Sequence, residues 1–282
     1  MLHGIAHPRF FHADVLSKSF IEERSYDVVL ANPPFKGAVD SSDVSATLPA
    51  RVSKTELLFV HLFLRLLDMG GRCAVIVPHG VLFASNSAHA RTRKVLVEEN
   101  RLEAVVSIPS GTFRPYAGVS TAVLVFTRGG ETDRVMFYDM EHDGFSLDDK
   151  RIPVAETDIP DALDCWRNRH DSGFLASREG RLQELRREIA PLHAKSLLLQ
   201  REVGQLAFEA AIAARGEIEV DPRLLKAKAQ LSELHGTIVP RTNEINQLTR
   251  FFWVTKDTLR GSNYDLSAGR YREIEDEPTY YE

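Results

Sequence analysis

The strongest constraint on the fold of this chain is an alternation of two kinds of segment between Tyr26 and Phe137. One kind is short and apolar, as in β-strands, and comprises residues 26–31, 73–77, 104–107, 121–127 and 135–138. The other kind has apolar residues at helical spacing, over residues 54–68 and 88–100. Strands that alternate with helices are typical of crossover units, so the sequence predicts an α/β fold with a largely parallel sheet.

Glycines mark two places where the chain is expected to change course. Gly70-Gly71 follow the first helical segment and are expected to end that helix. The strands predicted at residues 121–127 and 135–138 are separated by a short link that contains Gly129-Gly130. Such a link is typical of a β-hairpin, so these two strands are expected to pair and to form an antiparallel edge of the sheet.

The pattern changes after residue 165, where apolar residues recur every three or four positions, as in amphipathic helices. The stripes include Leu182, Leu185, Ile189, Leu192, Leu199, Val203, Leu206, Leu231, Leu234, Ile238, Ile245 and Leu248. A helical hairpin or coiled-coil region with its turn at residues 216–222 is expected, and Pro191 and Pro240 are expected to kink or break its helices. The stripes are expected to pack on each other, and a groove for a partner is the alternative.

The chain is therefore expected to have three parts: residues 1–165, a helical assembly region over residues 166–250, and a C-terminal segment over residues 251–282 with an acidic tail. The 282 residues are 43% hydrophobic and 27% charged, which is typical of globular proteins. No stretch approaches the roughly 20 apolar residues of a membrane-spanning helix. The N-terminus does not resemble a secretory signal, so a cytoplasmic protein without membrane contact is expected.

The charge of the chain limits how it can bind DNA. A net charge of −5 excludes a uniformly basic nucleic-acid coat, so contact with DNA is expected to be local or shared with a partner. Arg91, Arg93 and Lys94 are expected to form a solvated helix face, with phosphate contact as the alternative. The 10 histidines are dispersed and neither cysteine has a Cys-x-x-Cys partner, so no metal site is expected.

The most informative motif is Asn32-Pro33-Pro34-Phe35, at the end of the strand predicted over residues 26–31. Ligands of open α/β sheets bind at the carboxyl ends of strands. The two prolines hold the backbone rigid, so the Asn32 side-chain carbonyl and the Pro33 backbone carbonyl form a fixed pair of acceptors beside the Phe35 ring. Such a group suits an aromatic amine, whose NH2 donates two hydrogens while its ring stacks. A proline turn that only ends the strand is the alternative.

The decapeptide Tyr-Asp-Val-Val-Leu-Ala-Asn-Pro-Pro-Phe, residues 26–35, resembles the catalytic motif of DNA methyltransferases that modify N6 of adenine. The chain is also similar, over most of its length, to the modification (methylase) subunit of type I restriction–modification systems. This resemblance is carried by residues 2–5, 13–16, 76–83, 108–113, 115–121, 252–254, 263–266 and 270–271. It implies a Rossmann-like sheet that uses S-adenosylmethionine to methylate adenine in double-stranded DNA. It also implies a specificity subunit as partner and a restriction subunit as a further one.

The resemblance implies a role for each residue of the motif. Asn32 and Pro33 would accept the two amino hydrogens and stabilise the positive charge that grows on the attacking nitrogen. Phe35 would stack on the extruded adenine. Phe113 or Tyr116 would form the other wall around the base, with buried packing as the alternative for each.

The cofactor residues are harder to find. A binding site for S-adenosylmethionine in this family needs a glycine-rich turn after the first strand, yet no Gly-x-Gly occurs in the sequence. Asp14 lies where the family has an acidic residue near the adenine of the cofactor, and a solvated or helix-capping Asp is the alternative. The sequence is therefore expected to be N-terminally truncated, with an incomplete sheet that exposes an apolar edge.

Two functions remain open from the sequence. The first is an adenine-N6 methyltransferase subunit that needs the missing segment and a specificity subunit. The second is a catalytically inactive fragment that acts only as an assembly module through its helical region. A Rossmann-type enzyme for a small molecule is disfavoured by the context of the Asn-Pro-Pro-Phe motif.

Overall fold

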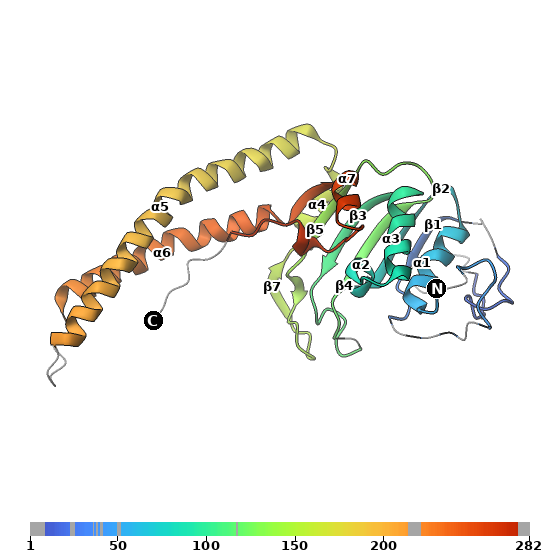
Figure 1. Cartoon of the computed structure of the whole chain (residues 1–282), viewed down its shortest axis with the longest axis horizontal. Helices are drawn as coiled ribbons and strands as arrows, with labels where there is room; N and C mark the ends of the chain where they lie inside the picture. The colour runs from blue at the N-terminus through green and yellow to red at the C-terminus, as the bar shows by residue number, and fades with distance from the viewer. Residues whose placement is uncertain are drawn as a thin grey trace. The chain divides into compact units, whose positions relative to one another are not determined.

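The computed structural model describes residues 9–22, 26–35, 37, 39, 42–49, 52–116, 118–213 and 221–275. The chain forms two compact units (Figure 1). Met1–Ala162 and Phe252–Tyr271 make up the first, which we call the sheet unit. Leu163–Phe251 and Arg272–Glu282 make up the second, which we call the helical unit.

A six-stranded sheet in the order β1-β2-β4-β3-β5-β8 organises the sheet unit. Its strands are β1 (Tyr26–Ala31), β2 (Leu67–Pro78), β3 (Arg101–Ile108), β4 (Thr121–Thr127), β5 (Arg134–Asp139) and β8 (Phe251–Thr255). β1 is parallel to β2 and β3 is parallel to β5, whereas β4 is antiparallel to both of its neighbours, β2 and β3. β1, β2, β3 and β5 therefore run in one direction, and their carboxyl ends share one edge of the sheet, which we call the carboxyl edge. The predicted α/β class is confirmed.

One face of this sheet is covered by helices α1 (Thr55–Leu66), α2 (Gly80–Phe83) and α3 (Ser87–Glu98) (Figure 1). Alternate strand residues point into the core beneath them, as expected of a pleated strand. These include Cys73, Val75, Val77, Leu124, Phe126, Val105 and Phe137. α7 (Lys256–Gly261) and the short 3-10 helix η1 (Ala268–Arg270) add Leu259 and Ala268 to the same core. Phe252–Tyr271, which follow Leu163–Phe251 of the helical unit in the sequence, thus complete the sheet unit.

The outermost described strand, β1, is buried on one side only. Val29 and Ala31 pack against the core, whereas Val28 is 52% exposed and Leu30 is 80% exposed. Strands of parallel sheets are ordinarily buried on both faces, so β1 departs from this pattern. β1 therefore exposes apolar side chains on one face at the margin of the described sheet.

The predicted hairpin of the strands at residues 121–127 and 135–138 is wrong. β3 lies between β4 and β5, so these two strands do not pair, and the antiparallel strand lies inside the sheet. The link that follows β4 crosses the start of β3 instead. Asn100 and Thr132 hold it there: Gly129 N donates to Asn100 Oδ1 at 3.0 Å, and Leu102 N donates to Thr132 Oγ1 at 3.0 Å.

The place of Gly70-Gly71 in the structure also differs from the expectation. The helix ends at Leu66, and both glycines lie inside β2. Gly70 N donates to Arg128 O at 2.9 Å, and Gly70 has a φ of +83°, which favours glycine. The glycines therefore shape the beginning of β2, and the helix ends without them.

The helical unit is built on two long helices, α5 (Ser172–Ala213) and α6 (Pro222–Leu248), which pack on each other. Leu185, Ile189, Leu199, Leu234, Ile238 and Ile245 form their buried core, so the predicted stripes do pack together. Pro191 and Pro240 lie inside these helices, and neither breaks its helix. Most of the turn predicted at residues 216–222 lies outside the described residues. No helix in the described part of the chain is long and apolar enough to cross a membrane.

Three further elements complete the described chain. A two-stranded sheet is formed by β6 (Asp143–Phe145) and β7 (Pro153–Thr157), which pair antiparallel. α4 (Ile159–Arg167) follows it. In the loop of this hairpin, Asp148 Oδ1 accepts from the backbone N–H of Lys150 at 2.9 Å. The hairpin is therefore an ordered element, and it becomes relevant at the carboxyl edge.

Candidate functional site

The Asn32–Phe35 turn begins directly after β1, at the carboxyl edge of the sheet. Asn32 and Pro34 are exposed, whereas Pro33 and Phe35 are half-buried. Neither proline has a backbone N–H, so the turn cannot continue the ladder with β2. The motif therefore lies where the strand pattern predicted it, with the Asn32 side chain open to solvent.

Phe35 contacts Phe113, which belongs to the loop after β3. The ring centroids are 5.4 Å apart and the ring planes make an angle of 73°, an edge-to-face arrangement. β1 and β3 are not neighbours, because β2 and β4 lie between them. At about 4.8 Å per strand, this contact spans roughly 14 Å of the sheet edge.

Of the two aromatic residues expected beside the base, the structure brings only Phe113 to Phe35. Tyr116 is 96% exposed. The rings of Phe35 and Phe113, expected on opposite sides of the base, also leave no space for a base between them in this structure. A base stacked between two rings needs roughly 7 Å, twice the spacing of about 3.4 Å between stacked bases, and the 5.4 Å between the centroids is too short for that.

The loop that carries Phe113 is held by the β6–β7 hairpin. Gly111 has a φ of +99°, and a Cβ atom there would clash with the Leu147 carbonyl oxygen. Arg114 Nη1 donates to Asp149 Oδ1 at 3.2 Å. One contact on each side of Phe113 thus joins this loop to the hairpin.

Asp14 lies in a local turn. Its Oδ1 accepts from Leu16 N at 3.1 Å, and its backbone carbonyl accepts from Ser17 N at 3.2 Å. The residue is exposed, as in the solvated alternative. A glycine-rich turn of the Gly-x-Gly type is absent from the sequence. The residues present therefore do not fit a complete site for S-adenosylmethionine.

His79 is a residue that the sequence reasoning missed. It is the first residue after β2, and its N–H donates to Ser120 O at 2.9 Å. Its imidazole packs on the Phe83 ring with centroids 5.5 Å apart. Burial lowers the pKa of His79, and the carboxylates of Asp139 and Asp265 oppose that shift. The available signal was a polar residue placed directly after a parallel strand.

Arg93 corrects the expectation of a solvated basic face. Arg91 and Lys94 are exposed, but Arg93 is 1% exposed. Its guanidinium donates to Tyr264 O at 2.7 Å and to Val81 O at 3.1 Å. Arg93 is therefore a structural residue, and the burial of its guanidinium prevents contact with a phosphate.

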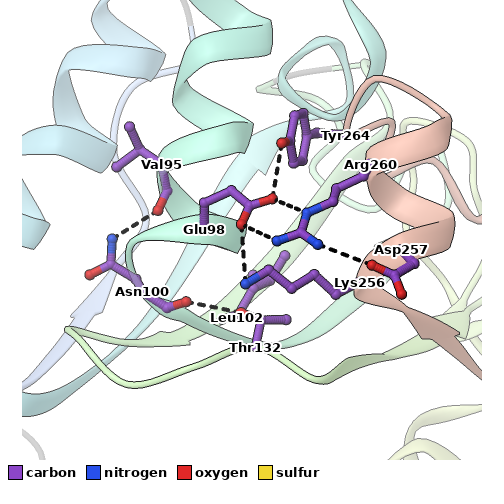
Figure 2. A network of polar contacts seen from close by, with 9 residues as sticks. All are labelled: Val95, Glu98, Asn100, Leu102, Thr132, Lys256, Asp257, Arg260 and Tyr264. Atoms are coloured by element: carbon purple, nitrogen blue, oxygen red, sulfur yellow. Dashed lines mark hydrogen bonds and ion pairs between the residues drawn. The ribbon is translucent and has the colours of Figure 1, made fainter.

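A polar network connects α3 with α7 at the opposite edge of the sheet (Figure 2). Glu98 accepts from Arg260 Nε at 2.6 Å and from Tyr264 OH at 2.9 Å, and Lys256 Nζ lies 3.1 Å from its carboxylate. These donors, Arg260 above all, lower the pKa of Glu98 to about 2. A polar cavity of about 720 Å³ lies beside the network. Because the cavity is also lined by Glu131, Asp133 and Asp257, its charge does not favour an anionic ligand.

No group of three metal-ligating side chains occurs among residues that the structure describes. Both cysteines are buried and free. Burial raises the pKa of Cys73 to about 12, so its thiol is protonated and unreactive at neutral pH. The carboxyl edge thus offers amide, carbonyl, imidazole and aromatic groups, a set suited to holding a planar polar ligand.

The sequence of this chain is similar to those of known proteins. Residues 1–188 match the family model described as N-6 DNA Methylase. The chain is 34% identical over 184 residues to the type I restriction enzyme EcoEI methylase subunit of Escherichia coli, which covers 64% of this chain and 37% of that protein. It is 26% identical over 196 residues to the MpnII methylase subunit of Mycoplasma pneumoniae, which covers 62% and 36%.

A solved structure gives a similar result. A chain from a study of the assembly and conformational transition of a type I restriction–modification system superimposes with a TM-score of 0.58 at 25% identity, and covers 99% of this chain and 45% of that chain. The present chain thus spans less than half the length of these relatives. Because the family model matches 188 of the 282 residues, the chain belongs to the N-6 DNA methylase family.

Proposed function

We propose that this chain is a subunit of a type I restriction–modification DNA methyltransferase, which transfers a methyl group to N6 of adenine. One observation carries the proposal. In a member of the N-6 DNA methylase family, an exposed Asn-Pro-Pro-Phe turn stands at the carboxyl edge of the sheet, and its Phe35 contacts an aromatic residue of a second loop at that edge.

The acceptor pair accounts for the chemistry at nitrogen. The lone pair of an adenine amino group is delocalised into the ring, so this nitrogen is a weak nucleophile. If the Asn32 side-chain oxygen and the Pro33 carbonyl each accept one N–H, the nitrogen is drawn towards a pyramidal geometry. The same oxygens stabilise the positive charge that develops during attack, which is catalysis by electrostatic stabilisation of the transition state. No general base is required for this step.

The aromatic pair accounts for how the base is held. An adenine inside a duplex must be extruded before its amino group can reach the turn. Because Phe113 already contacts Phe35, the base stacks on the side of Phe35 that Phe113 leaves open. Phe113 then serves to fix the orientation of Phe35. In this arrangement Tyr116 contacts neighbouring nucleotides, for which its exposure suits it.

S-adenosylmethionine supplies an activated methyl group on a sulfonium, and this family implies that cofactor. Asp14 is the candidate contact that the sequence indicates, and its carboxylate already closes its own turn. We therefore assign to this chain the side of the reaction that binds the acceptor base. Its residues bind, orient and stabilise the amino nitrogen.

The net charge of the chain and the surface of its helical unit indicate the kinds of partner that it binds. A chain with net charge −5 gains affinity for double-stranded DNA from a more basic partner. The long helices also expose large apolar side chains, at Leu197, Leu198, Phe208, Ile212 and Leu225. Exposed apolar stripes on long helices are typical of partner surfaces. We assign this surface to a specificity subunit, with a restriction subunit as a further member of a cytoplasmic complex.

A second function is favoured by a specific observation. Asp14 is committed to a local turn, and the sequence has no Gly-x-Gly turn for the cofactor. A chain with this deficit acts as a catalytically inactive assembly module, whose helical unit binds partner subunits without methyl transfer.

One experiment separates the two functions. The full chain is co-expressed with its specificity subunit, and the purified product is tested for complex formation and for transfer of labelled methyl groups to adenine in duplex DNA. Methylation that falls by a factor of about 10² to 10³ in Asn32→Ala, with the complex intact, supports the methyltransferase. A stable complex without methylation supports the assembly module. Full turnover in Asn32→Ala removes Asn32 from the mechanism.

A further inference from the structure

The contact between Phe35 and Phe113 spans the end of a strand that carries a polar residue of its own. In the order β1-β2-β4-β3, Phe35 follows the first strand and Phe113 follows the last. Their rings nevertheless touch, with centroids 5.4 Å apart. The two loops therefore meet along the carboxyl edge, at which β2 also ends and His79 is its next residue.

The pairing register places His79 at the level of the sheet edge. Pro78 of β2 and Ile108 of β3 both pair with Thr121 of β4, so β2 and β3 end at the same height. His79 and the loop that carries Phe113 leave the sheet from that height. β1 ends earlier, since Ala31 pairs with Val75, and this leaves Asn32–Phe35 room to pass alongside the last residues of β2.

The backbone and ring of His79 are fixed. Its N–H donates to Ser120 O at 2.9 Å, and its ring packs on Phe83 with an angle of 61° between the planes. The side chain is half-buried. Within the part of the chain that the structure describes, neither ring nitrogen has a hydrogen bond to another group. An oriented imidazole with both nitrogens available is thus held at the carboxyl end of β2.

We propose that His79 is a further substrate-contacting residue, whose imidazole N–H donates to the ring nitrogen N1 of the target adenine. The assignment rests on the proposed function and deepens it. Asn32 and Pro33 satisfy the two amino hydrogens, but they leave the ring free to pivot about the amino group. A third hydrogen bond, to the ring nitrogen beside that group, fixes the base in one plane.

The chemistry of an imidazole suits this task. A neutral imidazole has one N–H donor, and the N1 atom of adenine is an acceptor. Position 1 of guanine carries a hydrogen, so the same donor faces an N–H there and disfavours that base. Burial lowers the pKa of His79, which keeps the ring neutral at pH 7 and avoids placing a second cation beside the developing positive charge on N6.

A chemical double-mutant cycle tests the contact. The full chain is purified with its specificity subunit, and the bound recognition sequence is identified by selection from random duplexes, a step that does not need turnover. Duplexes carrying adenine or 1-deazaadenine at the target are then compared. In 1-deazaadenine a C–H replaces N1, so the acceptor is lost while the amino group stays. Its weaker base pairing affects every protein variant equally and cancels in the cycle.

The expected result is specific to a base contact. His79→Ala lowers kcat/KM for the adenine duplex by about three- to tenfold, the range of one hydrogen bond. On the 1-deazaadenine duplex the same variant changes kcat/KM by less than about twofold, because the partner atom is already gone. His79→Asn or His79→Gln restores part of the activity, depending on which ring nitrogen donates. His170→Ala, an exposed histidine in the helical unit, is the matched control with no effect.

Two outcomes overturn the proposal. One is full activity of His79→Ala on adenine, and the other is an equal loss on both duplexes, which would mean that His79 only supports the loop structure. Equilibrium binding of the same four combinations, measured without cofactor, gives a second readout. If the wild-type complex does not methylate, the proposed function fails. The binding cycle still decides whether His79 contacts the base.

Discussion

Glu98 and Arg260 lie 162 positions apart in the sequence and are joined by two hydrogen bonds, with N–O distances of 2.6 and 2.8 Å (Figure 2). Lys256 and Tyr264 bind the same carboxylate from the same late segment of the chain. The Glu98 side chain is 17% exposed, so solvent screens these contacts only in part. The network fixes the segment around α7 to the end of α3.

Replacing Glu98 tests this anchoring. Glu98→Gln is expected to lower the free energy of unfolding at pH 7 by about 1–2 kcal/mol, since three donors lose a charged acceptor. Asp257→Asn is the control, because Asp257 is 89% exposed and its contact with Arg260 is screened. Urea unfolding checks both variants. Equal stabilities of Glu98→Gln and wild type would show that the network contributes no stability.

The same carboxylate makes the stability depend on pH. Its pKa is about 2 in the folded chain, below the ordinary value of 4.5. Its contribution is therefore complete above about pH 4.5 and is lost as the pH falls from there towards 2. The difference in unfolding free energy between wild type and Glu98→Gln is expected to shrink over that window.

His61 produces the second pH dependence. Its Nε2 lies 3.0 Å from Thr92 Oγ1, and that hydroxyl donates to Ala88 O, so Nε2 carries the hydrogen and donates. Burial lowers the pKa of His61 to about 4 from 6.5. The unfolded chain binds the proton first as the pH falls, so stability is present above about pH 6.5 and is lost towards pH 4.

The linkage can be measured with one variant. When the pH falls from 7.5 to 5, protonation of His61 in the unfolded chain is expected to lower the free energy of unfolding by about 2 kcal/mol. His61→Gln keeps a donor for Thr92 and does not titrate, so its stability is expected to fall less over the same interval. Urea unfolding at both pH values gives the comparison, and parallel pH profiles would contradict the assignment.

The aromatic pair leads to a prediction about the base. Phe35→Ala is expected to lower kcat/KM for methylation by about 10- to 100-fold, the range of one lost base–aromatic stack. Phe35→Tyr keeps the ring and is expected to retain most activity. Phe113→Leu is expected to cost more than Tyr116→Ala, because only Phe113 contacts Phe35. A larger effect of Tyr116→Ala would assign the second aromatic role to Tyr116.

The cofactor prediction concerns the chain on its own. With Asp14 in a local turn and no Gly-x-Gly turn, calorimetry with S-adenosylmethionine is expected to show no saturation below about 100 μM. Asp14→Asn is expected to change nothing. Tight one-to-one binding that disappears in Asp14→Asn would contradict this expectation and assign Asp14 to the cofactor.

The sequence predicted five of the six strands of the main sheet, but it predicted neither β8 nor the order of the strands. Periodicity identified the strands at residues 121–127 and 135–138 because it is a local property. The short link between them suggested a hairpin, but β3 takes the place between the two strands. Asn100 and Thr132, which hold the link across β3, are ordinary polar residues whose contacts depend on the final fold.

The candidate site shows the same limit. The place of Asn32 at the carboxyl edge followed from a strand that ends at two prolines. The sequence did not predict that Phe113 rather than Tyr116 contacts Phe35, because this contact depends on a loop held by Leu147 and Asp149. Arg93 looked like surface because charged residues are rarely fully buried, and only its backbone carbonyl partners explain its burial.

The division of the sheet unit into two stretches of chain has a consequence for protein synthesis. Residues 252–271 leave the ribosome after the whole helical hairpin, yet they carry Arg260 for Glu98 and the Tyr264 carbonyl for Arg93. At 5–20 residues per second, translation from residue 162 to residue 271 takes roughly 5–20 s. Throughout that interval the nascent core lacks Leu259 and Leu266. A premature stop codon anywhere in the hairpin would therefore remove part of the core of a unit whose strands β1 to β5 had already been made.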